Sequence, residues 1–315
     1  MKQSKAFSLI ELSIVILVIG ILIAGVTQAS NMIYEFSLAA AKNLTKTSGI
    51  ESIKDMTLWL DATRANSDSS LINSNGKTDI SNNDRIKTWS DANPRRSRAE
   101  LSFTRTPFST DITKYHPVYI KNGLNGLPSI KFDGEYNCLE GLTSFGEIFK
   151  TNELTMFFVL IMKGPFGVNQ RFLTMNTTDT SRINVWFVPW DNSTFLWTDY
   201  RGKDETTYTN NSFNLPSQFP NFDKFPILLS IRLQTNGRLS AKFNGKSLTA
   251  IATRQISGQL ELGKTLTIHM GWPYGIEDNP QFYLSEMIFY NSGLKNEEIL
   301  YVEEYLSKKW GIALK

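Results

Sequence analysis

The stretch KAFSLIELSIVILVIGILIAGV, residues 5–26, opens the chain with a nearly unbroken apolar segment. As a helix rising about 1.5 Å per residue, the part from Phe7 to Val26 would extend about 30 Å, which matches the hydrocarbon core of a bilayer. Lys2 and Lys5 precede this segment, so the short leader should stay in the cytoplasm while the bulk of the chain crosses. The sequence therefore predicts an N-terminal transmembrane helix.

Glu11 is the one ionisable residue between Phe7 and Val26. An acid at the centre of a membrane helix costs roughly 2.5 to 3.5 kcal/mol, less near an end, and such residues are usually kept for a partner. The alternative is a cleavable signal peptide with a small-residue exit around residues 27–29. A segment that is discarded needs no carboxylate, so Glu11 favours a helix that is retained and assembled.

This leader resembles that of type IV pilins and type II secretion pseudopilins: a short basic start, a small residue, a phenylalanine, and a glutamate as the fifth residue after the cut. The resemblance implies that a prepilin peptidase cleaves between Ala6 and Phe7, removes residues 1–6 and methylates the Phe7 amine. It also implies that Glu11 neutralises the N-terminal amine of a neighbouring subunit in a filament. Ala6 stands where the family usually has glycine, a departure expected to slow cleavage.

The pattern after the apolar segment predicts where the helix ends and the head begins. Residues 7–42 keep good helix formers without proline, so we expect one transmembrane and assembly helix over this range. Four apolar residues of its second half are spaced for one helix face: Met32, Ile33, Phe36 and Ala40. Residues 43–55 turn polar and include Gly49, which predicts a linker, and residues 56–315 form the remaining domain.

The remaining domain alternates short β-rich runs with turn residues. The runs expected as strands are 57–62, 85–91, 127–134, 154–163, 183–190, 194–201, 225–234, 239–246, 266–272 and 282–291. Three dipeptides give strong hairpin signals: Asp133-Gly134, Asn236-Gly237 and Asn244-Gly245. The pattern predicts a mainly β sandwich.

A short helix should close the chain over residues 296–309. Glu297 and Glu298 lie where the first turn would be, and an apolar stripe recurs at helical spacing. We expect this helix to lie against the sandwich, anchored by Leu306 and Trp310.

The same domain resembles a bacterial laminin-G-like domain of the concanavalin A-like jelly-roll group. The resemblance rests on LWLDA, on Trp89 and Asp91, on NGLPSIKFDG and FNGK, and on the closing YLSEMIFYNSGLKNEEILYVEEYLSKKWGI. It implies a jelly-roll sandwich with a terminal helix. Such domains sometimes bind calcium, to which Asp191 and Asp199 could contribute, but two acids are not a full ligand set, so no metal site or cofactor is assigned.

No catalytic motif stands out, and we expect no enzyme activity. The E-x-D-x-x-E spacing of laminarinase-type glycosidases is missing, as are G-x-S-x-G and phosphate-binding loops. Trp190 and Tyr200 could offer flat faces to sugar rings, although alternate aromatic residues in sandwich strands more often fill the core. Without Lys2 and Lys5 the chain has 31 of its 33 basic side chains and 30 acidic ones, so its net charge is near zero. The charge therefore gives no basis for binding nucleic acid.

The sequence thus predicts a minor pilin or pseudopilin of a type IV pilus or type II secretion filament. Its partners would be other pilin subunits, prepilin peptidase and the bacterial inner membrane, with the N-terminus cytoplasmic before assembly. The head would be periplasmic or extracellular and would bind a glycan or a surface protein. The alternative is a secreted or membrane-anchored lectin-like carbohydrate-binding protein that is not assembled into a filament.

The mass of the mature N-terminal peptide distinguishes a prepilin from a conventional secreted protein. We expect this peptide to begin at Phe7 and to carry one methylated amine, because the leader resembles a prepilin substrate. Mass spectrometry of the membrane-extracted protein measures both properties together. A mature start at Ser30 would instead identify a conventional signal peptide.

Overall fold

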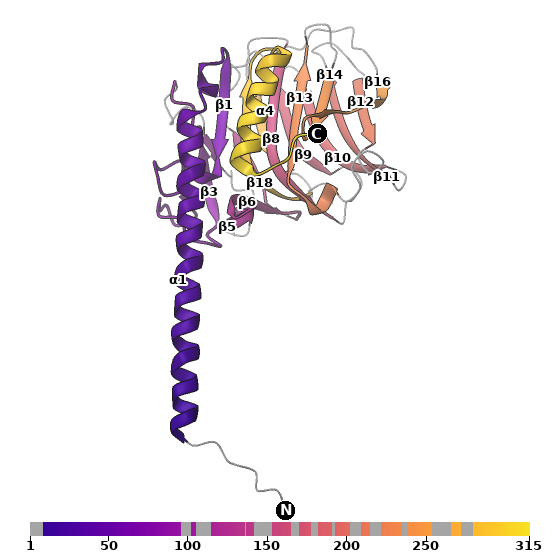
Figure 1. The fold of residues 1–315 in the computed structure, drawn as a ribbon. Coiled ribbons are helices and arrows are strands. Elements are labelled where there is room, and N and C mark those ends of the chain that lie inside the picture. Colours follow the sequence, from indigo (N-terminus) through magenta and orange to yellow (C-terminus); the bar gives the residue numbers. More distant parts are fainter. Residues whose placement is uncertain are drawn as a thin grey trace, which may run out of the picture.

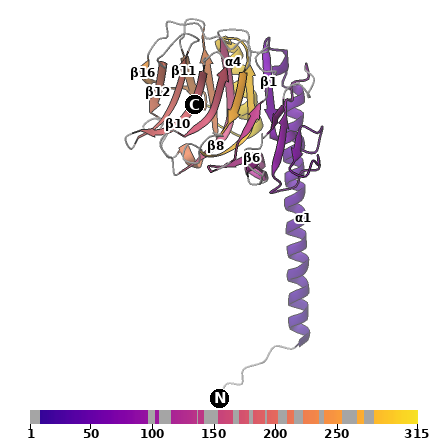
Figure 2. The same ribbon diagram turned by 180° about the vertical axis from the view of Figure 1, so that it is seen from behind.

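The computed structural model consists of one long helix and a β-sandwich head. It describes residues 9–95, 102–104, 115–135, 137–141, 153–164, 170–177, 182–190, 193–201, 209–214, 222–234, 239–253, 266–271 and 280–315. The helix α1 (Leu9–Thr47) runs along one side of the head and projects well beyond it (Figure 1). A second helix, α4 (Asn296–Trp310), lies on the head, and the view from behind shows the two sheets of the sandwich (Figure 2).

The head contains two sheets in which all pairings of named strands are antiparallel. The eight-stranded sheet has the order β15-β14-β13-β8-β18-β6-β5, and β1 pairs with β18. Its strands are β1 (Met56–Asp61), β5 (Val118–Leu124), β6 (Leu127–Asp133), β8 (Leu154–Lys163), β13 (Ile227–Leu233), β14 (Leu239–Phe243), β15 (Lys246–Ser247) and β18 (Gln281–Tyr290).

The ten-stranded sheet has the order β16-β12-β11-β10-β9-β17-β7-β4-β3-β2. Its strands are β2 (Leu71–Asn73), β3 (Ile86–Ser90), β4 (Ser102–Thr104), β7 (Leu139–Gly141), β9 (Arg171–Thr177), β10 (Arg182–Trp190), β11 (Ser193–Arg201), β12 (Thr209–Asn214), β16 (Ala250–Thr253) and β17 (Leu266–Met270). Within the described ranges, three 3-10 turns join elements: η1 (Ile50–Ser52), η2 (Ala62–Arg64) and η4 (Phe222–Lys224). Each predicted β run contains a strand, which confirms the mainly β sandwich.

The hairpin signals have different outcomes. Asn244 and Gly245 join β14 to β15 with φ values of 50° and 81°, the left-handed pair that a tight hairpin requires. Asn236-Gly237 lies outside the described residues. The prediction for Asp133-Gly134 is wrong, because β6 pairs with β5 and β18 whereas the next strand belongs to the other sheet. The Asp133 carboxylate accepts a hydrogen bond from the Glu135 N–H at 2.9 Å and stabilises a turn that leaves the sheet.

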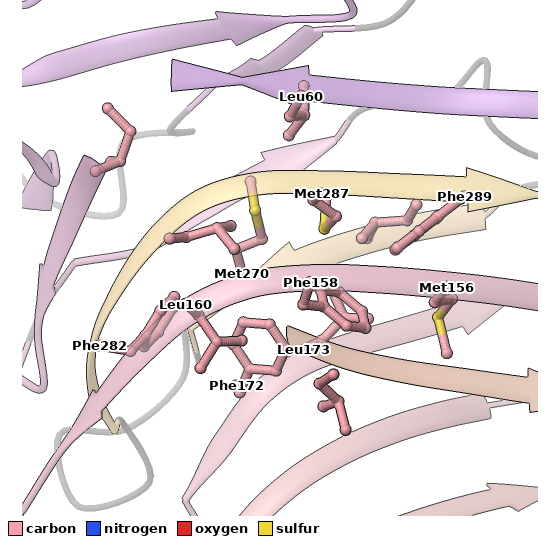
Figure 3. Close-up of a cluster of buried hydrophobic side chains, with 14 of the residues drawn as sticks. Leu60, Met156, Phe158, Leu160, Phe172, Leu173, Met270, Phe282, Met287 and Phe289 are labelled. Carbon is pink, nitrogen blue, oxygen red and sulfur yellow. The ribbon is translucent and has the colours of Figure 1, made fainter. Parts of the chain in front are cut away.

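Strand β8 explains why the head has three layers. Its run LTMFFVLIMK is apolar at every position but two, so both faces of the strand can be buried. Met156, Phe158 and Leu160 pack between the two sheets, where Phe172 and Leu173 of the other sheet meet them (Figure 3). Phe157 and Val159 belong to a second cluster with side chains of α4. The eight-stranded sheet is therefore the middle layer, between the ten-stranded sheet and α4.

A register shift in β18 reverses which side chains face which layer. The pairing with β8 shifts between Leu284 and Glu286. Before the shift Phe282 and Leu284 face the sandwich core, and after it Met287 does. Such a bulge inserts one residue and re-aims those that follow. Glu286 consequently lies on the α4 side of the sheet.

Helix α4 has the position expected from its sequence. Its stripe of Ile299, Val302 and Leu306 is buried against the sheet, and Trp310 at its end is fully buried. The Glu298 carboxylate accepts a hydrogen bond from the Lys295 N–H at 2.8 Å, which stabilises the first turn. The helix stops at Gly311, whose φ of 62° favours glycine.

The predicted helix end near Lys42 is wrong, because α1 continues to Thr47. The polar residues after Lys42 suggested a linker, but the Thr45 hydroxyl donates back to the Ala41 carbonyl at 3.1 Å and is buried. The rest of the predicted 43–55 linker is held to the head by hydrogen bonds. The Tyr301 hydroxyl donates to the Ser48 carbonyl at 2.5 Å and the Tyr290 hydroxyl to the Ile50 carbonyl at 3.1 Å.

The contribution of α4 docking can be measured with two substitutions on the same helix. Trp310→Ala removes a large, fully buried side chain and should lower the free energy of unfolding by about 3 to 5 kcal/mol. Leu300→Ala on the exposed side of α4 should change it by less than about 0.5 kcal/mol. Denaturant unfolding of the detergent-solubilised chain, followed by tryptophan fluorescence, gives both values. Equal stabilities for the two variants would contradict a helix docked through Trp310.

Candidate functional site

The first part of α1 presents apolar side chains to its surroundings. Large aliphatic residues from Leu9 to Val26 are between 48% and 86% exposed, so the head covers none of them. The helix is long and apolar enough to cross a membrane, with a window of mean hydropathy 2.9. These residues need an apolar environment, which a bilayer or neighbouring helices can supply.

Polar residues in this apolar part are satisfied locally. The Ser13 hydroxyl donates to the Ile10 carbonyl at 2.8 Å, and the Thr27 hydroxyl donates to the Ile23 carbonyl at 2.9 Å. Both bonds lower the cost of placing a hydroxyl in hydrocarbon. Glu11 lies in the first turn of α1, and Ala6 and Phe7 lie outside the described residues.

Beyond Val26, α1 has one face on the head and another face uncovered. Tyr34, Ala41 and Thr45 are buried against the head. Ile33 and Phe36 are 66% and 70% exposed. The apolar face predicted for this part of the helix therefore does not pack on the head, and it continues the exposed surface of the membrane-spanning part.

A first contact holds α1 beside β5. The Lys121 ammonium lies 4.0 Å from the centre of the Tyr34 ring, a cation–π contact. The Tyr34 hydroxyl also shares a hydrogen bond with Tyr119, and burial raises the pKa of both phenols. The Glu35 carboxylate lies 3.9 Å from the same ammonium, but it is largely exposed and adds little.

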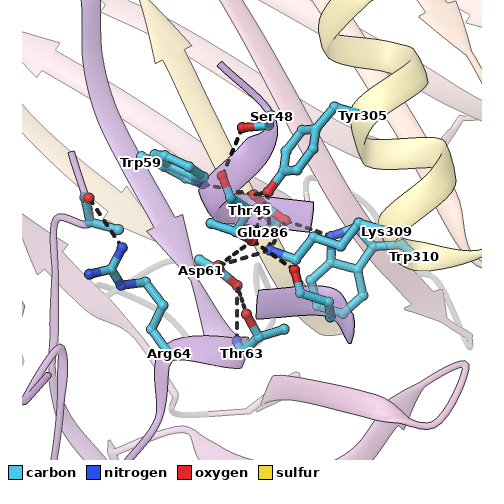
Figure 4. A network of polar contacts seen from close by, with 12 residues as sticks. Thr45, Ser48, Trp59, Asp61, Thr63, Arg64, Glu286, Tyr305, Lys309 and Trp310 are labelled. Atoms are coloured by element: carbon cyan, nitrogen blue, oxygen red, sulfur yellow. Dashed lines mark hydrogen bonds and ion pairs between the residues drawn. The ribbon is translucent and has the colours of Figure 1, made fainter. Parts of the chain in front are cut away.

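A second contact, deeper in the molecule, joins the end of α1 to the end of the chain. We call it the junction network, and Figure 4 shows it. It consists of Thr45 on α1, Trp59 and Asp61 on β1, Glu286 on β18, and Tyr305, Lys309 and Trp310 on α4.

Lys309 is the centre of the junction network. Its ammonium lies 2.8 Å from the Asp61 carboxylate and 2.8 Å from the Glu286 carboxylate, and all three side chains are fully buried. Thr45 brings α1 into the network, because its hydroxyl lies 3.2 Å from the Tyr305 hydroxyl and 3.5 Å from Asp61. Lys309 therefore links α4 to β1 and β18, and Thr45 attaches α1 to this group.

Glu286 is surrounded by hydrogen-bond donors. The Trp59 indole N–H donates to it at 2.7 Å, the Tyr305 hydroxyl at 2.8 Å and the Trp310 indole N–H at 2.6 Å. An indole N–H can only donate, so these partners fit an ionised carboxylate. Burial raises the pKa of Glu286, and the Lys309 ammonium opposes that rise.

This arrangement is suited to holding parts together. Breaking a buried ion pair typically costs about 3 to 5 kcal/mol, because it leaves a charge without compensation. The groups have no access to solvent, so a substrate could not reach them. The junction network joins the end of α1 to the head.

The aromatic and acidic residues predicted for ligand binding lie on or beside the hairpin of β10 and β11. Trp190 is paired with Ser193 at the turn of this hairpin, whereas Tyr200 is paired with Ile183 near its other end. Seven residues of strand separate the two, about 23 Å at 3.3 Å per residue, so the register does not bring them together. Asp199 follows the same strand, opposite Asn184, and Asp191 lies outside the described residues. Their role in binding stays a prediction.

Sequence reasoning missed the acidic and basic residues of the junction network. Glu286 is the one charged residue within the strand QFYLSEMIFY, just as Glu11 is in the membrane segment. A single acid in a buried apolar run needs a partner, so the argument applied to Glu11 also applied here. The identity of that partner, Lys309, depends on how α4 packs and is not local to the sequence.

Comparison with known proteins finds the two parts of the chain separately. Residues 1–27 match the family model of the prokaryotic N-terminal methylation motif. No curated protein sequence matches the chain. The chain therefore carries the methylation motif of prepilin-type proteins in front of a β-sandwich domain, as predicted.

Solved structures resemble the head at low sequence identity. The binding domain of botulinum neurotoxin serotype D matches with a TM-score of 0.52 and 13% identity, over 83% of this chain and 55% of that chain. The receptor binding domain of botulinum neurotoxin D gives 0.51 and 13%, over 84% and 57%. Domain 4 of AbnA, a GH43 extracellular arabinanase from Geobacillus stearothermophilus in complex with arabinotriose, gives 0.50 and 11%, over 81% and 98%. The chain spans little more than half of the neurotoxin structures, and at these identities the likeness shows the fold.

Removing the central cation of the junction network should make stability depend on pH. Lys309→Met leaves two buried carboxylates without compensation and should cost about 3 to 5 kcal/mol near neutral pH. It also removes the group that opposes the raised pKa of Glu286. The folded state then holds a proton that the unfolded state has released, so the free energy of unfolding should rise as the pH falls from about 7.5 to about 5.5. Urea midpoints at the two pH values test this.

Lys308→Met is the matched control for that substitution. Lys308 precedes Lys309 on α4 but is exposed. It should change the free energy of unfolding by less than about 0.5 kcal/mol and should add no such pH dependence. The same pH response in both variants would mean that the buried carboxylates are not the cause.

Proposed function

We propose that the protein is a minor pilin or pseudopilin of a type IV pilus or a type II secretion filament. A prepilin peptidase cleaves it between Ala6 and Phe7 and methylates the new amine. Before assembly α1 holds it in the bacterial inner membrane with its N-terminus in the cytoplasm and its head in the periplasm. In the filament α1 packs against the same helix of other subunits, and the head is carried outside.

The observation that carries this proposal is the length of the uncovered apolar surface on α1. It reaches from Leu9 past Val26 to Phe36, which is 70% exposed. A bilayer accounts for the part up to Val26, about 30 Å long. The ten residues that follow add about 15 Å, and neighbouring helices in a filament would cover their apolar face. An anchor alone has no need of that extension.

The head supports a display role and not a catalytic one. The junction network directs it away from the membrane-spanning part of α1 as one body. Two of the structures with a similar fold are binding domains of a neurotoxin, and the third was solved with arabinotriose. We infer that this head binds a glycan or a surface protein. Because it is a large sandwich, a minor or tip subunit fits better than the repeating subunit of the fibre.

Glu11 should matter for assembly and not for insertion. If it meets the Phe7 amine of a neighbour, Glu11→Ala leaves that amine buried without a partner in the filament. Insertion should be as good or better, since the helix becomes more apolar. We expect normal cleavage and membrane retention, but depletion from sheared filaments, with Glu11→Asp intermediate. The ratio of filament-associated to membrane-bound protein measures this in cells with intact pilus machinery.

Glu35→Ala is a matched control on the same helix, because Glu35 is largely exposed and lies outside the membrane-spanning part. Its ratio should equal that of the native chain. Equal ratios for all the variants would make Glu11 a tolerated polar residue and α1 only an anchor.

A further inference from the structure

A cavity lies beside α4 on the outer face of the eight-stranded sheet. It has a volume of about 500 Å³ and lies between the first turns of α4 and the strands β13, β14 and β15. In Figure 1 the strands β13 and β14 continue to one side of α4, past the area that the helix covers. The volume is in the range of small-molecule sites in proteins.

The outer face of these strands is polar where it lines the cavity. Inward residues such as Ile231 and Ala241 are buried in the sandwich core, so their neighbours in sequence face outward. The register pairs Ser230 with Lys242, Arg232 with Ser240, and Lys242 with Ser247. The result is a compact group of three hydroxyls and two cations on adjacent strands.

The two cations are held in place by different partners. The Lys242 ammonium lies 3.1 Å from the buried Glu303 carboxylate, to which the Ser230 hydroxyl donates at 2.7 Å. The Arg232 guanidinium donates through Nη1 to the Leu294 carbonyl and to the Asn296 side-chain oxygen, both at 3.0 Å. These three charged side chains sum to one positive charge, since Glu303 balances only one of the cations.

Both cations have hydrogen-bond donors to spare. An ammonium has three N–H groups and Lys242 uses one on Glu303, while its side chain is 28% exposed. Arg232 uses Nη1, and its buried Nε–H has no partner among the described residues. Because this Nε is buried, a ligand would bind the guanidinium through its Nη groups, and the positive charge strengthens such hydrogen bonds.

We propose that this cavity binds an acidic sugar, a hydroxylated ring that carries one carboxylate. Arg232 and Lys242 bind the carboxylate, and the hydroxyls of Ser240 and Ser247 bind those of the ring. The aliphatic wall formed by Leu248, Ile299 and Leu300 covers the ring's apolar face. The inference deepens the proposed display function by naming a ligand class for the head, and it does not depend on filament assembly.

Direct binding to the full-length chain tests the site. The probes are glucuronate, glucose and acetate, which carry the carboxylate with the ring, the ring alone and the carboxylate alone. Titration calorimetry in a detergent without a sugar headgroup should give glucuronate an affinity at least about tenfold above either of the others, because charge-assisted and neutral hydrogen bonds act together.

Substitutions assign the binding to this cavity. Lys242→Gln keeps a donor for Glu303 but loses the charge, so the affinity for glucuronate should fall about tenfold. Ser240→Ala removes a hydroxyl without touching an ion pair and should lower it about threefold. Lys87→Gln, an exposed lysine on β3 of the other sheet, should leave it unchanged. Melting temperatures identify any variant that fails to fold.

Four results would overturn the proposal. If acetate bound as tightly as glucuronate, the cavity would be a simple anion site. If glucose bound as tightly as glucuronate, the two cations would have no role in binding. Absent glucuronate binding to the folded native chain, or unchanged affinity in folded Ser240→Ala, would mean that the cavity is not the site. None of these results affects the filament ratios by which the proposed function is judged.

Discussion

One buried ammonium joins the elements of the head against which the end of α1 packs. Lys309 lies between the carboxylates of Asp61 and Glu286, and each of these groups comes from a different segment of the chain. Ion pairs of this kind seldom add much net stability, since desolvation offsets attraction, but they penalise strongly any arrangement that separates them. The junction network therefore selects one placement of α4 on the sheet, and Thr45 extends that selection to α1.

The position of α1 on the head matters because α1 is also the membrane-spanning helix. A helix that packs in a filament can determine where its head lies only if the connection between helix and head is stiff. Here the helix continues into the head without a flexible linker, and hydrogen bonds to Ser48 and Ile50 hold the residues that follow it. In the filament proposed above, the register between subunits along α1 would then determine where the ten-stranded sheet and the cavity beside α4 are presented.

Local patterns in the sequence were enough for much of this architecture. The apolar segment, the alternating β runs and the stripe of α4 each reflect the burial of one face, so periodicity reveals them. Asp133-Gly134 misled because a turn signal does not say which sheet the next strand joins. Thr45 looked like part of a linker, since its partner on α4, Tyr305, is 260 positions away in the sequence. The group at Lys309 could not be predicted for the same reason, although Glu286 in an apolar strand indicated that some partner exists.

The most direct test of the account measures how rigidly α1 is joined to the head. Spin labels at Asn31→Cys on α1 and Lys87→Cys on β3 report one distance, in a background where the buried Cys138 is replaced by alanine. Pulsed electron resonance on the detergent-solubilised chain should give a single narrow distance distribution. The distribution should broaden when Lys309→Met is added. A broad distribution in the chain with Lys309 intact would contradict the account, because α1 would then be a tether that moves independently of the head.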